Sequence, residues 1–181
     1  MTFTPVQIPS PDRTPAPVGD APHVVIVGAG FGGLACAMAQ GGKKVRVTIV
    51  DRVNYHLFLP LLYQVATAAL AAPDVAAPIR QILRRQKNTT VLMADVVKVV
   101  PDQKHLVLED GAELPYDALI LAPGMSHNYF GHQDWAAHAP GLKTLSEALE
   151  IRSKILRAFE RAERSDDEDE RRALTTFVVI G

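Results

Sequence analysis

Four glycines stand within six residues, from Gly28 to Gly33. They follow Val24–Val27, an apolar run that is too short for a helix and rich in β-branched residues, and they precede the small residues of 34–40. This order predicts a strand, a tight turn and a helix. The first turn of such a helix has N–H groups without partners and a positive dipole end, so the loop suits a phosphate.

The glycines have separate expected roles. Gly28 permits the turn, Gly30 lets the backbone approach a pyrophosphate, and Gly33 lets the helix pack against the strand. A second predicted strand, Val45–Val50, delivers Asp51 about 20 residues beyond the loop, where this fingerprint places an acid for ribose hydroxyls. The sequence therefore predicts a dinucleotide site.

Composition and charge narrow the function further. The chain has 181 residues, of which 48% are hydrophobic and 22% charged, and its formal net charge is −1. This length predicts one domain or slightly more. The near-neutral charge indicates no basic surface for nucleic acid. No apolar run approaches the roughly 18 residues that a membrane-spanning helix needs. Residues 1–22 hold six prolines and no hydrophobic period. They predict a disordered, extended leader and not a secretory signal.

The middle of the chain completes an α/β pattern. A helical stripe predicts a helix over 74–85, and the strand-like segments Val91–Val100 and Lys104–Glu109 predict a small antiparallel meander. Leu119–Leu121 is a buried type of strand that should return to the parallel sheet. It ends at 122–124, and the carboxyl ends of such strands are where doubly wound sheets bind ligands.

The last part of the chain predicts a connection to a second unit. Thr144 and Glu147 form a capping-box pattern before a helix expected to reach about Arg164. A solvated acidic linker should follow at 166–170, and Thr176–Ile180 should be the first strand of a second, truncated Rossmann unit. The expected divisions of the chain are 1–22, 23–143 and 144–181.

No cluster of side chains indicates a metal site or a catalytic triad. Cys36 is the only cysteine, so no internal disulfide can form, and we expect it to pack on the helix after the glycine loop. His127, His132 and His138 are five and six residues apart, which matches no i, i+4 pair on a helix. We therefore predict no metal ligands and no catalytic side chain.

Five features of the sequence belong together: the glycine loop, Asp51, His56–Thr67, Ala122–Gly124 and Asn128–His132. In combination they resemble type II NADH:quinone oxidoreductases, which are two-dinucleotide flavoproteins. The resemblance covers about residues 23–181. It implies a Rossmann-like domain that binds FAD, an inserted second unit that binds NADH, and a later segment that completes the FAD domain.

The resemblance also implies an activity. Such enzymes pass a hydride from NADH to FAD and then electrons to a quinone, without pumping protons. They are cytoplasmic and lie on the inner face of the membrane, on which C-terminal helices dock. We expect this chain alone to bind FAD weakly and to lack the activity, because the second nucleotide unit and the returning segment are absent.

Site residues follow from the same match. Asp51 would hold the adenosine ribose, Val96 would offer a backbone contact to the adenine, and Gln64 is a candidate on the quinone side. The expected cofactor-binding residues are Gly28, Gly30, Phe31, Gly32, Gly33, Asp51, Arg52, Val96, Ala122, Pro123 and Gly124.

Two departures from the resembled pattern affect local contacts. Pro123 stands where a threonine is usual, and it removes a hydroxyl and a backbone donor. The loop after Thr67 often carries a glycine where this chain has Ala68 and Ala69, and alanine restricts a backbone that needs positive φ.

Two other functions stay open. The chain could be a noncatalytic FAD-binding remnant whose exposed sheet edges need a partner chain. It could instead belong to another FAD- and NAD(P)-dependent reductase, of the sulfide:quinone or ferredoxin type, although sulfide chemistry needs cysteines that this portion lacks. The sequence leaves open the quinone, the choice between NADH and NADPH, and the oligomeric state.

Overall fold

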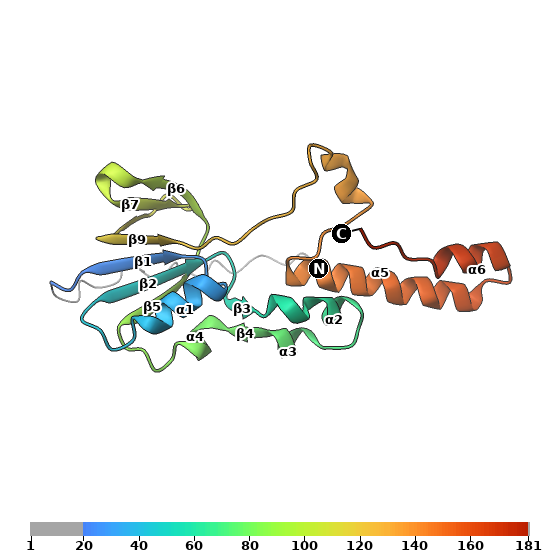
Figure 1. Ribbon diagram of the computed structural model, residues 1–181, viewed down its shortest axis with the longest axis horizontal. Helices are drawn as coiled ribbons and strands as arrows, with labels where there is room; N and C mark the ends of the chain where they lie inside the picture. The colour runs from blue at the N-terminus through green and yellow to red at the C-terminus, as the bar shows by residue number, and fades with distance from the viewer. Residues whose placement is uncertain (1–19, 181) are drawn as a thin grey trace, which may run out of the picture.

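The structure, a computed structural model that describes residues 20–180, has a four-stranded parallel sheet at one end of the molecule (Figure 1). Its strand order is β5 (Thr89–Met93), β2 (Arg46–Asp51), β1 (His23–Val27) and β9 (Ala118–Leu121). This order confirms the parallel sheet and the return of the chain to it at β9. Nearly all of the predicted leader lies outside the described residues.

The sheet is covered on both faces. Helices α1 (Phe31–Ala39) and α4 (Ile79–Ile82) pack on one face, and the three-stranded antiparallel sheet β6–β7–β8 packs on the other. Strands covered on both faces are apolar throughout and do not alternate with polar residues, which explains the continuous valine and isoleucine runs. The bounds of the covering strands are β6 Val96–Val100, β7 His105–Leu108 and β8 Glu113–Pro115.

Neighbouring residues of one strand serve the two cores. Ile26 of β1 lies in the core beneath α1, and Val25 lies in the core beneath the meander. Both are completely buried, and each contributes about 1.5–3 kcal/mol by leaving water. This packing fixes the end of β1, from which the glycine loop starts.

The prediction that Val91–Val100 belongs wholly to the meander is wrong. Its first half lies in β5, which pairs with the open edge of β2, and only the second half forms β6. The break falls at Ala94, whose N–H donates to the carbonyl of Asp51 at 3.0 Å. Local pattern could not show this, because the need for a fourth parallel strand arises from tertiary packing.

The predicted helix over 74–85 is also interrupted. It is divided into α3 (Ala72–Val75) and α4 by the short strand β4 (Ala76–Pro78), which pairs antiparallel with β3 (Tyr55–Leu57). Pro78 explains the interruption, because its ring excludes a helical N–H and pushes Ala77 into extended backbone.

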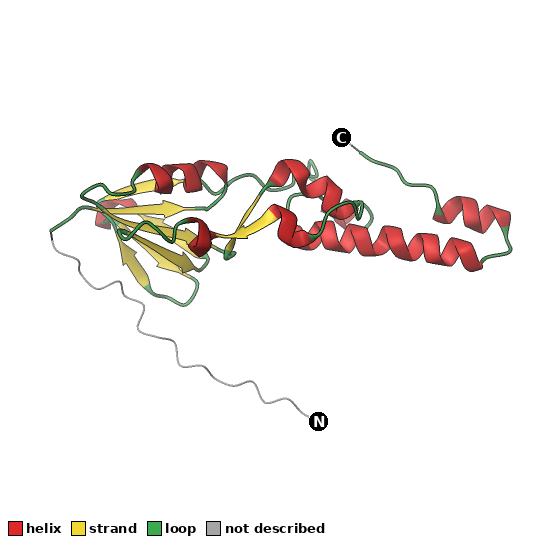
Figure 2. Cartoon of the chain, turned by 90° about the horizontal axis from the view of Figure 1, so that it is seen from below, coloured by secondary structure: helices red, strands yellow, loops and turns green. Residues whose placement is uncertain are grey.

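A helical group lies at the far end of the elongated molecule from the sheet (Figures 1 and 2). Here α2 (Leu62–Ala66) packs on α5 (Leu145–Arg164), with Leu62 and Ala148 buried between them. The predicted capping box at the start of α5 is confirmed: Thr144 Oγ1 accepts from Glu147 N–H, and the Glu147 carboxylate accepts from Thr144 N–H. The remaining short 3-10 helices are Leu59–Leu61, Pro101–Gln103 and Gln133–Ala137.

The last residues differ from prediction in two ways. The acidic segment is not only a linker, because Asp167 caps the N-terminus of α6 (Glu168–Leu174). Three acids in the first turn of α6 also interact favourably with the positive end of the helix dipole. The predicted strand Thr176–Ile180 is not formed; these residues have no strand neighbour within 20–180, and Val179 is 94% exposed. The proposed division of the chain at residue 143 stays a prediction.

Candidate dinucleotide-binding site

Gly28 begins the loop at the carboxyl end of β1. Its φ is +96°, and its N–H donates to the Val50 carbonyl at 2.7 Å. A side chain there would overlap the carbonyl of Ala122 at the end of β9. Glycine is thus required both by conformation and by the close approach of two strand ends.

Gly33 sets the distance between α1 and this loop. A Cβ on Gly33 would overlap the carbonyl oxygen of Gly28. The helix therefore packs directly on the turn, in the arrangement expected for the last glycine of the fingerprint.

Gly30 and Gly32 face open space instead. Among the described residues nothing lies within 4 Å of a Cβ built on Gly30, and the nearest atom to one on Gly32 is the Ala122 methyl at 4.0 Å. Gly30 is the N-cap of α1 and has no side chain to bond the first-turn N–H groups, and this turn contains no acid. Free donors and vacant space together fit a pyrophosphate.

Asp51 lies beside this loop, at the end of β2. Its Oδ2 accepts from Ala29 N–H at 2.6 Å, and its Oδ1 accepts from Val53 N–H at 2.9 Å. The side chain is half-buried and each oxygen keeps a further lone pair. The carboxylate can therefore accept from ribose hydroxyls while it holds the loop.

Arg52 and Val96 lie next to Asp51 on the same edge of the sheet. Arg52 Nε pairs with Asp95 Oδ1 at 3.5 Å, and both side chains are largely exposed, so this ion pair contributes little to stability. Val96 follows Asp95 and begins β6. The structure thus places Asp51 and Val96, the two residues predicted on the adenosine side, at or just beyond the carboxyl ends of the neighbouring strands β2 and β5.

The residues 122–124 lie at the end of β9. The Ala122 N–H donates to the Val27 carbonyl at 2.8 Å, which joins β9 to the strand before the loop. Pro123 is exposed, and Gly124 has φ +75°, where the chain turns away into the segment 125–143. Ends of three strands therefore meet around the glycine loop.

Gln64 lies elsewhere, on α2. Its Nε2 donates to the hydroxyl of Tyr63 at 3.0 Å, and the helix packs on α5. Within residues 20–180 the Gln64 amide makes no hydrogen bond to the glycine loop. Its place on the quinone side stays a prediction.

His56 is a contact of the loop that the sequence analysis did not single out. Its Nδ1 lies 2.9 Å from the carbonyl oxygen of Ala29, and its ring meets the Phe31 ring edge-on at a centroid distance of 5.1 Å. Phe31 also contacts Phe58 at 5.5 Å. No spacing rule links residues 27 apart, so no sequence pattern could have indicated this contact.

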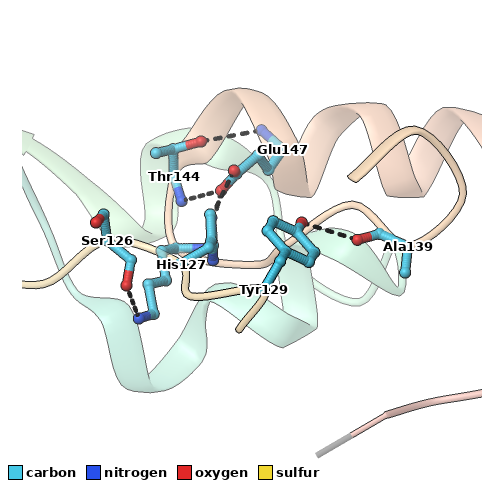
Figure 3. Close-up of polar contacts among 7 residues, drawn as sticks. Ser126, His127, Tyr129, Ala139, Thr144 and Glu147 are labelled. Atoms are coloured by element: carbon cyan, nitrogen blue, oxygen red, sulfur yellow. Dashed lines mark hydrogen bonds and ion pairs between the residues drawn. The ribbon is translucent and has the colours of Figure 1, made fainter. Parts of the chain in front are cut away.

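A second polar cluster fixes the segment 125–143 to α5 (Figure 3). His127 Nε2 lies 2.7 Å from Glu147 Oε1, and Glu147 Oε2 accepts from the N–H groups of Lys143 and Thr144. Burial alone would raise the pKa of Glu147, but these donors together lower it. The cluster is structural, since each of its groups is used in holding the helix start.

The other two histidines of the segment lie apart from this cluster. His132 stacks on Trp135 with a centroid distance of 4.3 Å. In the described part of the chain, no three His, Cys, Asp or Glu side chains are grouped as metal ligands would be. None of the helices described is long and apolar enough to cross a membrane.

The sequence pattern of pyridine nucleotide-disulphide oxidoreductases matches residues 22–181. The chain belongs to this family. The α/β fold with a Rossmann-like parallel sheet and a small antiparallel meander is that of its members, and the resemblance found in the sequence is confirmed by individual relatives.

Individual proteins similar to this chain include one curated relative and two solved structures. It is 45% identical over 170 residues to a type II NADH:quinone oxidoreductase of Mycobacterium tuberculosis, covering 92% of this chain and 36% of that protein. The NDH2 structure from Plasmodium falciparum has a TM-score of 0.75 at 26% identity, covering 83% of this chain and 32% of that one. The structure of the sulfide:quinone oxidoreductase of Aquifex aeolicus has a TM-score of 0.71 at 24% identity, covering 77% of this chain and 33% of that one. This chain thus spans about a third of the curated relatives it matches.

Proposed function

We propose that this chain is the FAD-binding portion of a non-electrogenic NADH:quinone oxidoreductase. The observation that carries the proposal is the open surface beside Gly30 and Gly32, next to the free N–H groups that begin α1 and to the carboxylate of Asp51. The 45% identity with a type II NADH:quinone oxidoreductase supports this activity over others of the family.

Different residues would bind different parts of the cofactor. The N–H groups of Gly30, Phe31 and Gly32 would bind the pyrophosphate, where the helix dipole favours negative charge. Asp51 would accept from the ribose hydroxyls, and Val96 would meet the adenine along its backbone. The remaining family positions would surround these contacts: Gly28, Gly33, Arg52, Ala122, Pro123 and Gly124.

Bound FAD would supply the redox chemistry, taking a hydride from NADH and giving electrons to a quinone in the whole protein. The chain itself would bind and orient the cofactor. Gln64 would lie toward the quinone. In the whole protein we expect cytoplasmic placement on the inner face of the membrane.

Pro123 limits what the β9 end can contribute. Its nitrogen carries no hydrogen, so this position offers neither a backbone donor nor the hydroxyl of the usual threonine. Of the two backbone donors beside Pro123, Ala122 N–H is already used by the Val27 carbonyl, and Gly124 N–H makes no hydrogen bond within residues 20–180. The end of β9 should thus offer at most one backbone donor, and the phosphate should depend mainly on the α1 end.

Sulfide chemistry is the weaker candidate. Cys36 is the one cysteine in the 181 residues, and it packs against the core beneath α1. The likeness to the sulfide:quinone oxidoreductase is one of fold alone, at 24% identity.

A comparison of two flavins tests the proposal. FMN has the isoalloxazine ring and one phosphate but lacks the adenosine that Asp51 and Val96 would hold. Titration calorimetry should show FAD binding at least about tenfold more tightly than FMN, which is about 1.4 kcal/mol. Equal affinities for FAD and FMN, or no binding of either flavin, would contradict the proposed FAD site at the glycine loop and Asp51.

A further inference from the structure

We propose that His56 is a positioning residue for the glycine loop, which orients the peptide between Ala29 and Gly30 so that the Gly30 N–H faces the pyrophosphate. The inference rests on the proposed FAD site. It assigns a role to a residue outside the glycine fingerprint, on a different strand.

His56 is itself held in place before it contacts the loop. It is the middle residue of β3 and pairs with Ala77 of β4, and its side chain is half-buried. Phe31 meets the imidazole at an interplanar angle of 83°, which restricts the ring plane. The side chain thus reaches Ala29 from a supported position.

The contact determines the tautomer of His56. A carbonyl oxygen only accepts, so the Nδ1 that lies 2.9 Å from the Ala29 oxygen must donate a hydrogen. This assigns the proton of the neutral imidazole to Nδ1 and leaves Nε2 bare.

The planarity of the peptide carries the effect to Gly30. In a trans peptide the C=O of Ala29 and the N–H of Gly30 are coplanar and point in opposite directions. His56 therefore aims the Gly30 N–H by fixing the carbonyl. Among the described residues that N–H has no hydrogen-bond acceptor, and it stands beside the open space.

The loop needs this support because glycine flanks Ala29 on both sides. Glycine has the widest backbone freedom, and ordering it during binding would weaken affinity. Asp51 holds the Ala29 N–H at 2.6 Å, and His56 holds its carbonyl. Both polar groups of one loop residue are thus fixed from two separate strands before a ligand arrives.

Two substitutions separate the hydrogen bond from the ring. His56→Phe keeps an aromatic ring against Phe31 and removes the donor, whereas His56→Asn keeps a donor near the place of Nδ1 and removes the ring. Calorimetry with ADP and with adenosine, which has no phosphate, measures the effect on each part of the ligand.

We expect His56→Phe to lower the affinity for ADP about tenfold and the affinity for adenosine less than about twofold. The affinity of His56→Asn for ADP should stay within about threefold of that of the unsubstituted protein. Unchanged ADP affinity in His56→Phe would overturn the role of His56 and leave the FAD site standing. Equal binding of ADP and adenosine by the unsubstituted protein would overturn both proposals.

A spectroscopic measurement does not depend on how the variants fold. Long-range ¹H–¹⁵N NMR at about pH 8 reports which imidazole nitrogen of His56 carries the proton. The Nδ1–H form is the expected result, and the Nε2–H form would overturn the proposal.

Discussion

The N–H of Ala29 lies 2.6 Å from Oδ2 of Asp51, although the two residues are 22 positions apart. The parallel pairing of Val27 with Val50 brings them together, because Asp51 comes one residue after Val50 and Ala29 two residues after Val27. The acid proposed to hold the ribose therefore also holds the loop proposed to hold the phosphates. This coupling makes Asp51 the most informative single position in the site.

Asp51→Asn should lower both stability and affinity. The amide keeps one acceptor and places a donor against either Ala29 N–H or Val53 N–H. A charge-assisted hydrogen bond is lost and a donor loses its acceptor, so we expect a loss of about 1–3 kcal/mol in urea unfolding.

Asp95→Asn is the matched control, because this half-exposed acid lies near Asp51 and, within residues 20–180, its carboxylate pairs with Arg52 alone. It should change stability by less than about 1 kcal/mol. Equal effects of the two substitutions would argue that the Asp51 contacts to the loop are unimportant.

Signals close together in the sequence predicted the elements around the glycine loop correctly. The run before Gly28, the glycines, and the second strand with its acid lie within one βαβ unit, where each element is specified by its own residues. The capping box of Thr144 and Glu147 is equally local. For these elements the pattern alone led to the right structure.

Contacts between distant segments were not predictable in this way. The split of Val91–Val100 depends on β2 having an open edge, and the contact of His56 with Ala29 depends on β3 and β4 pairing first. The strand expected at Thr176–Ile180 failed for the same reason, since a strand requires a neighbour to accept its hydrogen bonds.

Ala68→Gly should stabilise the protein. Ala68 has φ +64°, a left-handed conformation that an L side chain disfavours, at the end of α2. We expect a gain of up to about 1 kcal/mol in urea unfolding, reduced by the greater freedom of glycine in the unfolded chain. Ala69→Gly, where φ is not positive, should lower stability; a gain there as well would refute the strain explanation.

Stability should depend on Glu147 in acid. Its pKa is lowered below 4.5 in the folded protein, so the unfolded chain takes up the proton more readily. The contribution is fully present above pH 4.5 and is lost as the pH falls through the lower, folded value. Urea unfolding followed from pH 6 downward, at intervals of about 0.5 unit, should show a shallower pH dependence in Glu147→Gln.

Glu150→Gln controls for the loss of any acid on α5. This carboxylate is exposed and pairs with Lys154 on the same helix. Glu150→Gln should change the loss of stability at low pH less than Glu147→Gln does. A larger change in Glu150→Gln would show that the capping cluster is not the source of this pH dependence.

The affinity of FAD for Gly30→Val tests the central claim most directly. Gly30 has extended backbone with φ −67°, and a Cβ there meets no described atom, so the variant should fold normally by circular dichroism. The added side chain would occupy the space proposed for the pyrophosphate. Ala35→Val adds comparable bulk to an exposed position of α1 outside the loop. The account predicts that Gly30→Val loses FAD binding in calorimetry while Ala35→Val retains it; a folded Gly30→Val protein that binds FAD like the unsubstituted chain would contradict it.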